Sequence, residues 1–171
     1  MQKLSFTRRL LVRVLSWLKE EYRLTSYAHI RWKAENGDAR AQYTLATMCE
    51  AGNGGFQPTG EALKWYQKAA FQGIAEAQLT LGIKYQHGQG VPKNETEALL
   101  WLRKAAEQGQ PEAQYQLANL YSEGLGTTRD LLQAAKWYRK AAERGHATAK
   151  RNFKELNSAN LPDDRDEAGC G

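Results

Sequence analysis

The chain has 171 residues, of which 42% are hydrophobic and 25% charged, and its formal net charge is +5. These values are typical of one globular domain or one short repeat array, and they exclude a chain that is disordered throughout. The two cysteines, Cys49 and Cys170, are too few and too far apart for a disulfide framework or a cysteine-based metal site, so we expect a reducing compartment.

The positive charge is concentrated near the N-terminus. Residues 1–33 carry eight basic and two acidic side chains, whereas residues 34–156 carry 15 basic and 13 acidic ones. Residues 157–171 carry one basic and four acidic side chains. Because the central part of the chain is nearly neutral and has no nucleic-acid recognition motif, we expect no nucleic-acid partner.

Residues 4–22 are expected to form a helix with leucines along one side and arginines on another. Its apolar stretch, residues 10–18, is interrupted by Arg13 and is shorter than the about 20 apolar residues that a membrane-spanning helix needs. A cleavable export signal is disfavoured, because charged residues follow the stretch and no small-residue cleavage site does.

Two interpretations of the N-terminal segment, residues 1–36, stay open. In the first, the segment is a degenerate capping repeat in which Trp32 and Ala34 cover the open face of the helices that follow. In the second, its helix lies on an anionic membrane surface or on a protein partner. The residues that would contact the membrane are Arg8, Arg9, Arg13 and Trp17.

A 36-residue period runs through most of the remaining chain. The residues that keep this step are Gly37, Gly73, Gly109 and Gly145, together with Trp65, Trp101 and Trp137. A period of this length predicts a repeat architecture, in which each unit buries its apolar face against the next. The three complete units are residues 37–72, 73–108 and 109–144.

Each unit is expected to contain two helices. Apolar residues recur every three or four positions in both halves of a unit, which is the spacing of one helix face. Asn94 and Asp130 precede second helices, where their side chains can cap the first free amides. No sustained apolar–polar alternation indicates a strand. The sequence therefore predicts an all-α fold, an α-solenoid of antiparallel helix pairs with helical caps.

The first unit departs from the other two. Cys49 stands where the later units have Tyr85 and Tyr121, and we expect it to be a small core residue. Pro58 and Gly60 precede its second helix, so we expect an irregular turn there.

These units resemble those of the Sel-one-like repeat family, a relative of the tetratricopeptide repeat. The characteristic residues of the second unit are Ala75, Ala77, Leu81, Gly82, Tyr85, Gly88, Gly90, Val91, Asn94, Ala98, Trp101, Lys104, Ala105, Ala106 and Gly109. The resemblance covers residues 37–156 and implies a bacterial protein-interaction scaffold or adaptor. In that family, such arrays serve in regulation, envelope assembly and host contact.

The C-terminal end is expected to close the array. Residues 146–156 begin a fourth unit and then turn polar, as a capping helix should. Residues 157–171 contain Pro162, an acidic cluster and a glycine-rich end, and are expected to be disordered. The predicted organisation is a basic segment over residues 1–36, repeats and cap over residues 37–156, and an acidic tail.

No catalytic site, cofactor or metal site is expected. His29, His87 and His146 share no spacing within the units and are expected to be solvated or loop residues. The Gly-x-Gly turns follow no strand and lack the Lys-Ser/Thr pair of a phosphate-binding loop. The regularly spaced tryptophans are expected to be core residues. The sequence thus predicts that the protein is not an enzyme.

The face of each first helix that lies roughly opposite its Ala/Leu face varies between units. We predict that this face binds a protein or peptide partner, while packing against a neighbouring helix pair is the alternative. The candidate residues are Arg40, Tyr43, Thr47, Glu76, Leu79, Ile83, Glu112, Tyr115 and Asn119. The expected location is the cytoplasm. If the N-terminal helix lies on a membrane, the protein is instead expected to be attached peripherally to the inner membrane face.

Overall fold

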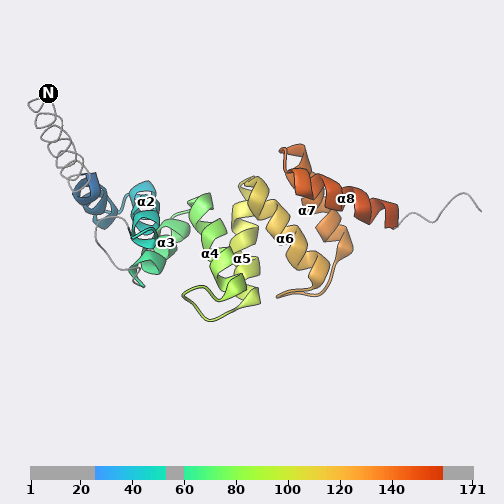
Figure 1. The fold of residues 1–171 in the computed structure, drawn as a ribbon, viewed down its shortest axis with the longest axis horizontal. Helices are drawn as coiled ribbons and strands as arrows, with labels where there is room; N and C mark the ends of the chain where they lie inside the picture. Colours follow the sequence, from blue (N-terminus) through green and yellow to red (C-terminus); the bar gives the residue numbers. More distant parts are fainter. Residues whose placement is uncertain (1–25, 53–59, 160–171) are drawn as a thin grey trace, which may run out of the picture. The chain divides into compact units, whose positions relative to one another are not determined.

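The computed structural model describes residues 26–52 and 60–159. The helix expected over residues 4–22, the turn at Pro58 and the acidic tail from residue 160 lie outside the described residues. Figure 1 shows a short helix at residues 26–35, followed by α2 (Ala39–Glu50), α3 (Glu61–Phe71), α4 (Ala75–His87), α5 (Glu95–Glu107), α6 (Pro111–Glu123), α7 (Leu131–Glu143) and α8 (Ala147–Ala159). These described residues contain no strand, so the predicted all-α class is confirmed.

The chain forms two compact units, Met1–Gln72 and Gly73–Gly171. In the first unit, α2 packs on α3. In the second unit, α4 packs on α5 and α6 on α7, while α5 contacts α6 and α7 contacts α8. The second unit is therefore two stacked helix pairs with α8 at the end. None of the described helices is both long and apolar enough to cross a membrane.

The start of each second helix depends on its capping residue. The Asn94 side chain accepts a hydrogen bond from the Glu97 amide, and the Asp130 side chain accepts one from the Gln133 amide. Both predicted caps are confirmed. By contrast, Gly60 at the N-terminus of α3 has no side chain to make this bond.

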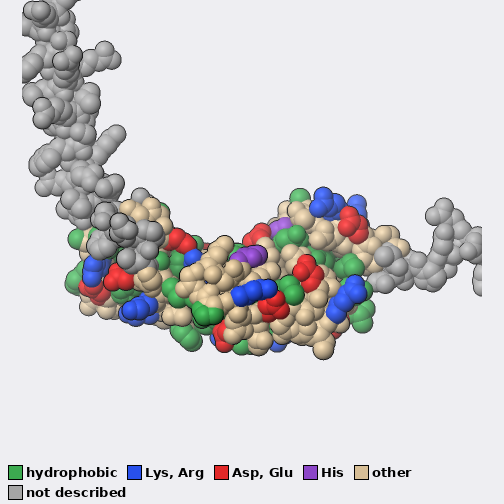
Figure 2. Space-filling view, turned by 60° about the horizontal axis from the view of Figure 1, so that its bottom comes forward, with side chains coloured by type: hydrophobic (Ala, Val, Ile, Leu, Met, Phe, Trp, Pro, Cys, Tyr) green, Lys and Arg blue, Asp and Glu red, His purple; other side chains and the backbone are tan. Residues whose placement is uncertain are grey.

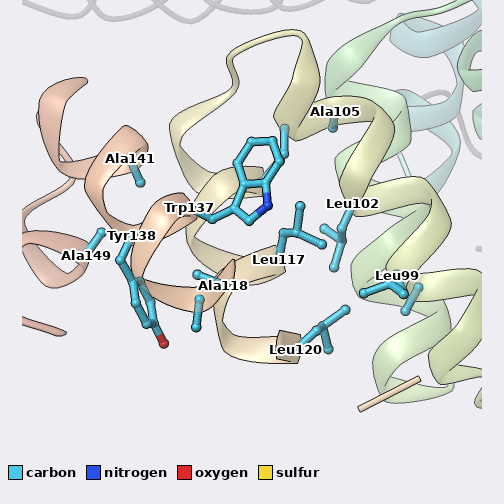
Figure 3. Packing of buried hydrophobic residues seen from close by; sticks show 14 residues of the cluster. Leu99, Leu102, Ala105, Leu117, Ala118, Leu120, Trp137, Tyr138, Ala141 and Ala149 are labelled. Atoms are coloured by element: carbon cyan, nitrogen blue, oxygen red, sulfur yellow. The ribbon is translucent and has the colours of Figure 1, made fainter. Parts of the chain in front are cut away.

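One hydrophobic cluster fills the second unit (Figure 3). Leu102 and Leu117 are fully buried between the helices, and small alanines such as Ala105 allow the helix axes to approach closely. Trp101 and Trp137 are more than nine-tenths buried, which confirms them as core residues. The ammonium group of Lys140 lies over the Trp137 ring, 4.3 Å from its centre, in a cation–π contact.

In each of the first two repeats, a glutamine after the second helix bonds back to residues near the start of the same repeat, and we call these the closing bonds. Gln108 Nε2 donates to the Gly73 carbonyl at 2.9 Å and to Gln78 Oε1 at 2.7 Å. Gln72 makes the same pair of bonds at the corresponding positions of the first repeat. The third repeat has Arg144 at this position, and Gln114 Oε1 is buried there without a hydrogen-bond partner.

The two Gly-x-Gly turns of the second unit differ in their surroundings. Gly90 and Gly126 both have positive φ, at 73° and 69°. A Cβ atom on Gly90 would meet nothing within 4 Å, whereas one on Gly126 would collide with the backbone carbonyl of Glu95 in α5. Only the turn between α6 and α7 therefore needs glycine for a close backbone approach as well as for its φ angle.

The helix at residues 26–35 covers part of the first unit. Tyr27 and Ala34 are buried, and Tyr27 lies beside the buried thiol of Cys49. Burial raises the pKa of that thiol, and Cys49 is confirmed as a core residue. The prediction that Trp32 helps to seal this face is wrong, because the Trp32 side chain is 62% exposed.

The last helix extends slightly further than expected. Helix α8 continues to Ala159, so residues 157–159 are helical and do not belong to a disordered tail. Phe153 and Leu156 pack against the core cluster of the second unit, while Lys150 and Lys154 are exposed. The outward side of α8 is thus polar, as a terminal cap requires.

Candidate partner-binding face

The nine residues predicted from the varying positions lie on α2, α4 and α6, the first helices of the three repeats. Arg40 is exposed and the other eight are partly exposed, so none belongs wholly to the core. We call these nine residues the first-helix face; the part on α2 belongs to the first unit, and the parts on α4 and α6 belong to the second.

In the first unit, this face is built around two tyrosine rings. Tyr43 in α2 and Tyr66 in α3 have ring centres 6.0 Å apart, and the Arg40 guanidinium lies 6.0 Å from the Tyr43 ring. The Tyr66 hydroxyl donates to Glu50 Oε2 at 2.7 Å. Burial and the nearby Glu50 carboxylate raise the pKa of Tyr66, so this hydroxyl stays protonated and keeps donating.

In the third repeat, the face forms a connected polar and aromatic cluster. Tyr115 in α6 lies between Tyr138 in α7, at 5.9 Å, and the His146 ring, which stacks on it at 4.5 Å. The Tyr138 hydroxyl donates to Asn119 Oδ1 at 2.6 Å. Tyr115 therefore packs against both neighbouring rings and still remains partly exposed. Both interpretations of this position, packing and surface display, apply to the same ring.

His146 completes the cluster and was missed by the sequence reasoning, which assigned it to solvent or a loop. Its Nδ1 accepts a hydrogen bond from the Ala149 amide at 3.1 Å, which caps α8. Since Nδ1 is an acceptor, the proton is on Nε2, which lies 3.1 Å from Glu112 Oε2 and donates to it. The other oxygen of Glu112 accepts from Gln116 at 2.7 Å. The available signal was the position of His146 directly before a helix, where caps stand.

The second repeat presents an apolar version of the same face. Leu79 and Leu102 occupy the positions of Tyr115 and Tyr138, and Leu79 packs against the core cluster. In the first repeat, the Tyr66 hydroxyl donates to Glu50. Leu102 and Gln86 occupy those two positions in the second repeat, and Gln86 Oε1 is buried there without a hydrogen-bond partner. Ile83, one turn further along α4, is partly exposed. At Leu79 and Ile83, this part of the face therefore offers aliphatic contact where the third repeat has Tyr115 and Asn119.

The groups of the described residues that most often carry reaction chemistry are hydrogen-bonded or buried here. Both ring nitrogens of His146 are engaged in hydrogen bonds, and the Cys49 thiol is buried. Within the ranges 26–52 and 60–159, no three metal-ligating side chains come together. Figure 2 shows acidic and basic side chains interspersed on one surface, not gathered into one charged patch. The four residues of the membrane alternative, Arg8, Arg9, Arg13 and Trp17, lie outside the described part.

Comparison with known proteins identifies the repeats. A model of the Sel1 repeat matches residues 39–73, 75–110 and 111–146. The solved structure of a Sel1 repeat protein from Oxalobacter formigenes is 36% identical, with a TM-score of 0.72, and the match covers 77% of this chain and 99% of that one. No curated protein sequence matches the chain.

Two further solved structures share the fold. A protective antigen with an SLR fold from uropathogenic Escherichia coli strains is 38% identical, with a TM-score of 0.73, over 77% of this chain and 28% of that one. Helicobacter pylori cysteine rich protein B is 18% identical, with a TM-score of 0.58, over 78% and 94% of the two chains. The predicted α-solenoid of helix pairs is therefore confirmed.

Proposed function

The chain belongs to the Sel1 repeat family, whose members generally mediate protein–protein interactions, and from this premise we propose that it is a non-catalytic scaffold or adaptor. Its partner is a protein or peptide that binds the first-helix face. We further propose a cytoplasmic location, which the small number of cysteines supports.

The observation that carries this proposal is the cluster around Tyr115 in the third repeat. Aromatic rings held rigidly by neighbours and left partly exposed lose little conformational entropy when a partner binds, which is why such residues dominate binding energies. Tyr115 is fixed from two sides, by Tyr138 and by His146. Glu112, with 45% of its side chain exposed, places a carboxylate beside the ring.

Site-specific photo-crosslinking tests which surface meets the partner. A photoreactive amino acid replaces Ile83, on the first-helix face, or Leu132 in α7, which is 83% exposed and outside that face. We expect a discrete crosslinked partner from position 83 and none from position 132. Crosslinks from position 132 alone would contradict the proposal.

A charge reversal gives an independent measurement. The variant Glu112→Lys should weaken binding of the crosslinked partner by about tenfold, since it removes a carboxylate beside the aromatic ring. Thermal unfolding of the same variant checks that the fold is intact. Unchanged affinity in a folded Glu112→Lys protein would remove the third repeat from the binding site.

A further inference from the structure

The charge on the first-helix face differs in sign between the two units. In the first unit, Arg40 is the charged residue of the face, whereas Glu76 and Glu112 stand at the corresponding positions in the second unit. The other six residues of the face are uncharged. The part of the face on α4 and α6 therefore carries acidic side chains and no basic one, which suits a partner segment with positive charge.

Glu112 keeps its negative charge although it makes two hydrogen bonds. One carboxylate oxygen accepts from His146 Nε2 at 3.1 Å, and the other accepts from the Gln116 amide at 2.7 Å. Because His146 Nδ1 accepts from a backbone amide, the ring has one proton and is neutral. Within residues 26–52 and 60–159, no lysine or arginine pairs with this carboxylate. Two neutral donors thus hold in place a charged side chain that is 45% exposed.

The geometry of this carboxylate favours a guanidinium over an ammonium group. A carboxylate has about four lone-pair sites on its two oxygens, and Glu112 uses one on each oxygen. The remaining sites allow two parallel hydrogen bonds, which the planar guanidinium makes and the ammonium group does not. Tyr115 is partly exposed three residues further along the same side of α6. Since guanidinium groups also lie against aromatic rings, one arginine can contact both side chains.

The chain has an arginine and a tyrosine in this arrangement in its first repeat. The Arg40 guanidinium lies 6.0 Å from the centre of the Tyr43 ring. These two residues correspond to Glu112 and Tyr115 in the third repeat. In both repeats, a second tyrosine ring lies beside the first, with ring centres 6.0 and 5.9 Å apart. The third repeat therefore has a similar tyrosine pair and a carboxylate in place of the arginine, so the guanidinium can come from a partner.

Aliphatic side chains lie on the preceding first helix of the same unit. Leu79 in α4 occupies the position of Tyr115 in α6, and both pack against the hydrophobic cluster of the second unit. Ile83 follows one turn later on α4, and both aliphatic side chains are partly exposed. They offer contact to an apolar side chain of the same partner segment.

We propose that the segment bound by the second-unit part of the first-helix face contains an arginine and a nearby aliphatic residue. The guanidinium pairs with Glu112 and lies against Tyr115, while the aliphatic residue contacts Leu79 and Ile83. This inference rests on the proposed scaffold function and names the chemistry by which the face selects its partner.

Peptide selection against the full chain tests this proposal. A phage-displayed library of random peptides is selected on the immobilised protein, and the peptides that a photoreactive residue at position 83 crosslinks are kept. We expect these peptides to share an arginine. Replacing that arginine by glutamine should weaken binding by about tenfold, and replacing it by lysine should weaken binding by a smaller factor. Binding of the arginine peptides should also weaken at high salt.

Two variants of the protein identify the carboxylate that the arginine contacts. With Glu112→Gln, the arginine and glutamine forms of a selected peptide should bind equally, because the charge partner is gone. Glu107→Gln removes an exposed carboxylate of α5 outside the first-helix face, and this matched control should keep the tenfold preference for arginine. Thermal unfolding checks that both variants are folded. The peptide replacements need no protein variant, so they test the proposal even if Glu112→Gln is unstable.

The outcomes separate this proposal from the scaffold function. Peptides that crosslink from position 83 and lack an arginine would overturn the proposal and leave the scaffold function intact. An equal preference for arginine in Glu112→Gln and Glu107→Gln would also overturn it. A library that yields no peptide crosslinked from position 83 would argue against arginine recognition by this face. Crosslinking of the cellular partner from the same position reports separately on the scaffold function.

Discussion

The second and third repeats have the same backbone plan and different outward faces. Both have a buried tryptophan covered by a lysine, and both have a capped second helix. On the first-helix face, however, Leu79 of the second repeat is replaced by Tyr115 in the third, and behind the face Leu102 is replaced by Tyr138. The difference shows that the periodic residues fix the helix pair, whereas the face can change from aliphatic to polar without altering it.

The residues behind the face change together with it. In the second repeat, Gly82 lies against Leu102, and a Cβ atom on Gly82 would collide with the Leu102 side chain. The third repeat has Ala118 at the position of Gly82 and Tyr138 at that of Leu102. Each repeat therefore keeps its own matched set of small and large side chains, and a single exchange between repeats is expected to be unfavourable.

The largest expected difference between the two repeats concerns their turns. Gly126→Ala should lower the free energy of unfolding by about 3 kcal/mol, because the new methyl group meets both a positive φ and the Glu95 carbonyl. Gly90→Ala should cost only about 1 kcal/mol, from φ alone. Urea denaturation of both variants checks this. Equal decreases in the free energy of unfolding would show that the contact with α5 does not add to the cost of Gly126→Ala.

A smaller difference is expected at the starts of α6 and α8. His146→Ala should lower the free energy of unfolding by about 2 kcal/mol, since it removes the cap of α8, the bond to Glu112 and the stacking on Tyr115. Gln110 is the corresponding residue before α6, and its side chain makes no capping bond. Gln110→Ala should therefore change stability by less than about 0.5 kcal/mol. Equal shifts in melting temperature for the two variants would show that the contacts of His146 do not stabilise the protein.

The smallest effect is expected to be a gain. Arg144→Gln should restore the closing bonds that Gln108 makes in the second repeat and supply a donor to the orphaned Gln114 Oε1. We expect stabilisation by about 0.5–1 kcal/mol. The reverse exchange, Gln108→Arg, should destabilise by a similar amount. An unchanged denaturation midpoint for Arg144→Gln would show that the identity of residue 144 does not affect the stability of the third repeat.

The sequence predicted the repeated parts well, because they depend on local spacing. The helix pairs, the Asn94 and Asp130 caps and the buried tryptophans follow from periods of three to four and 36 residues. The contact of His146 with Glu112 joins residues 34 apart, and it depends on the angle at which α8 leaves α7, which no local pattern contains. The exposure of Trp32 was mispredicted for a similar reason, since hydrophobicity alone does not say which side of a short helix is covered.

The bonds of Gln108 also bear on how such a chain can grow. They begin and end within residues 73–108, so the closing contact needs no residue from another repeat. A tandem duplication of these 36 residues would copy donor and acceptors together and leave every such bond intact. Gene segments of this length can thus be added or lost while each copy keeps its own glutamine and acceptors, whereas an insertion between Gln78 and Gln108 would change the spacing of the donor and its acceptors.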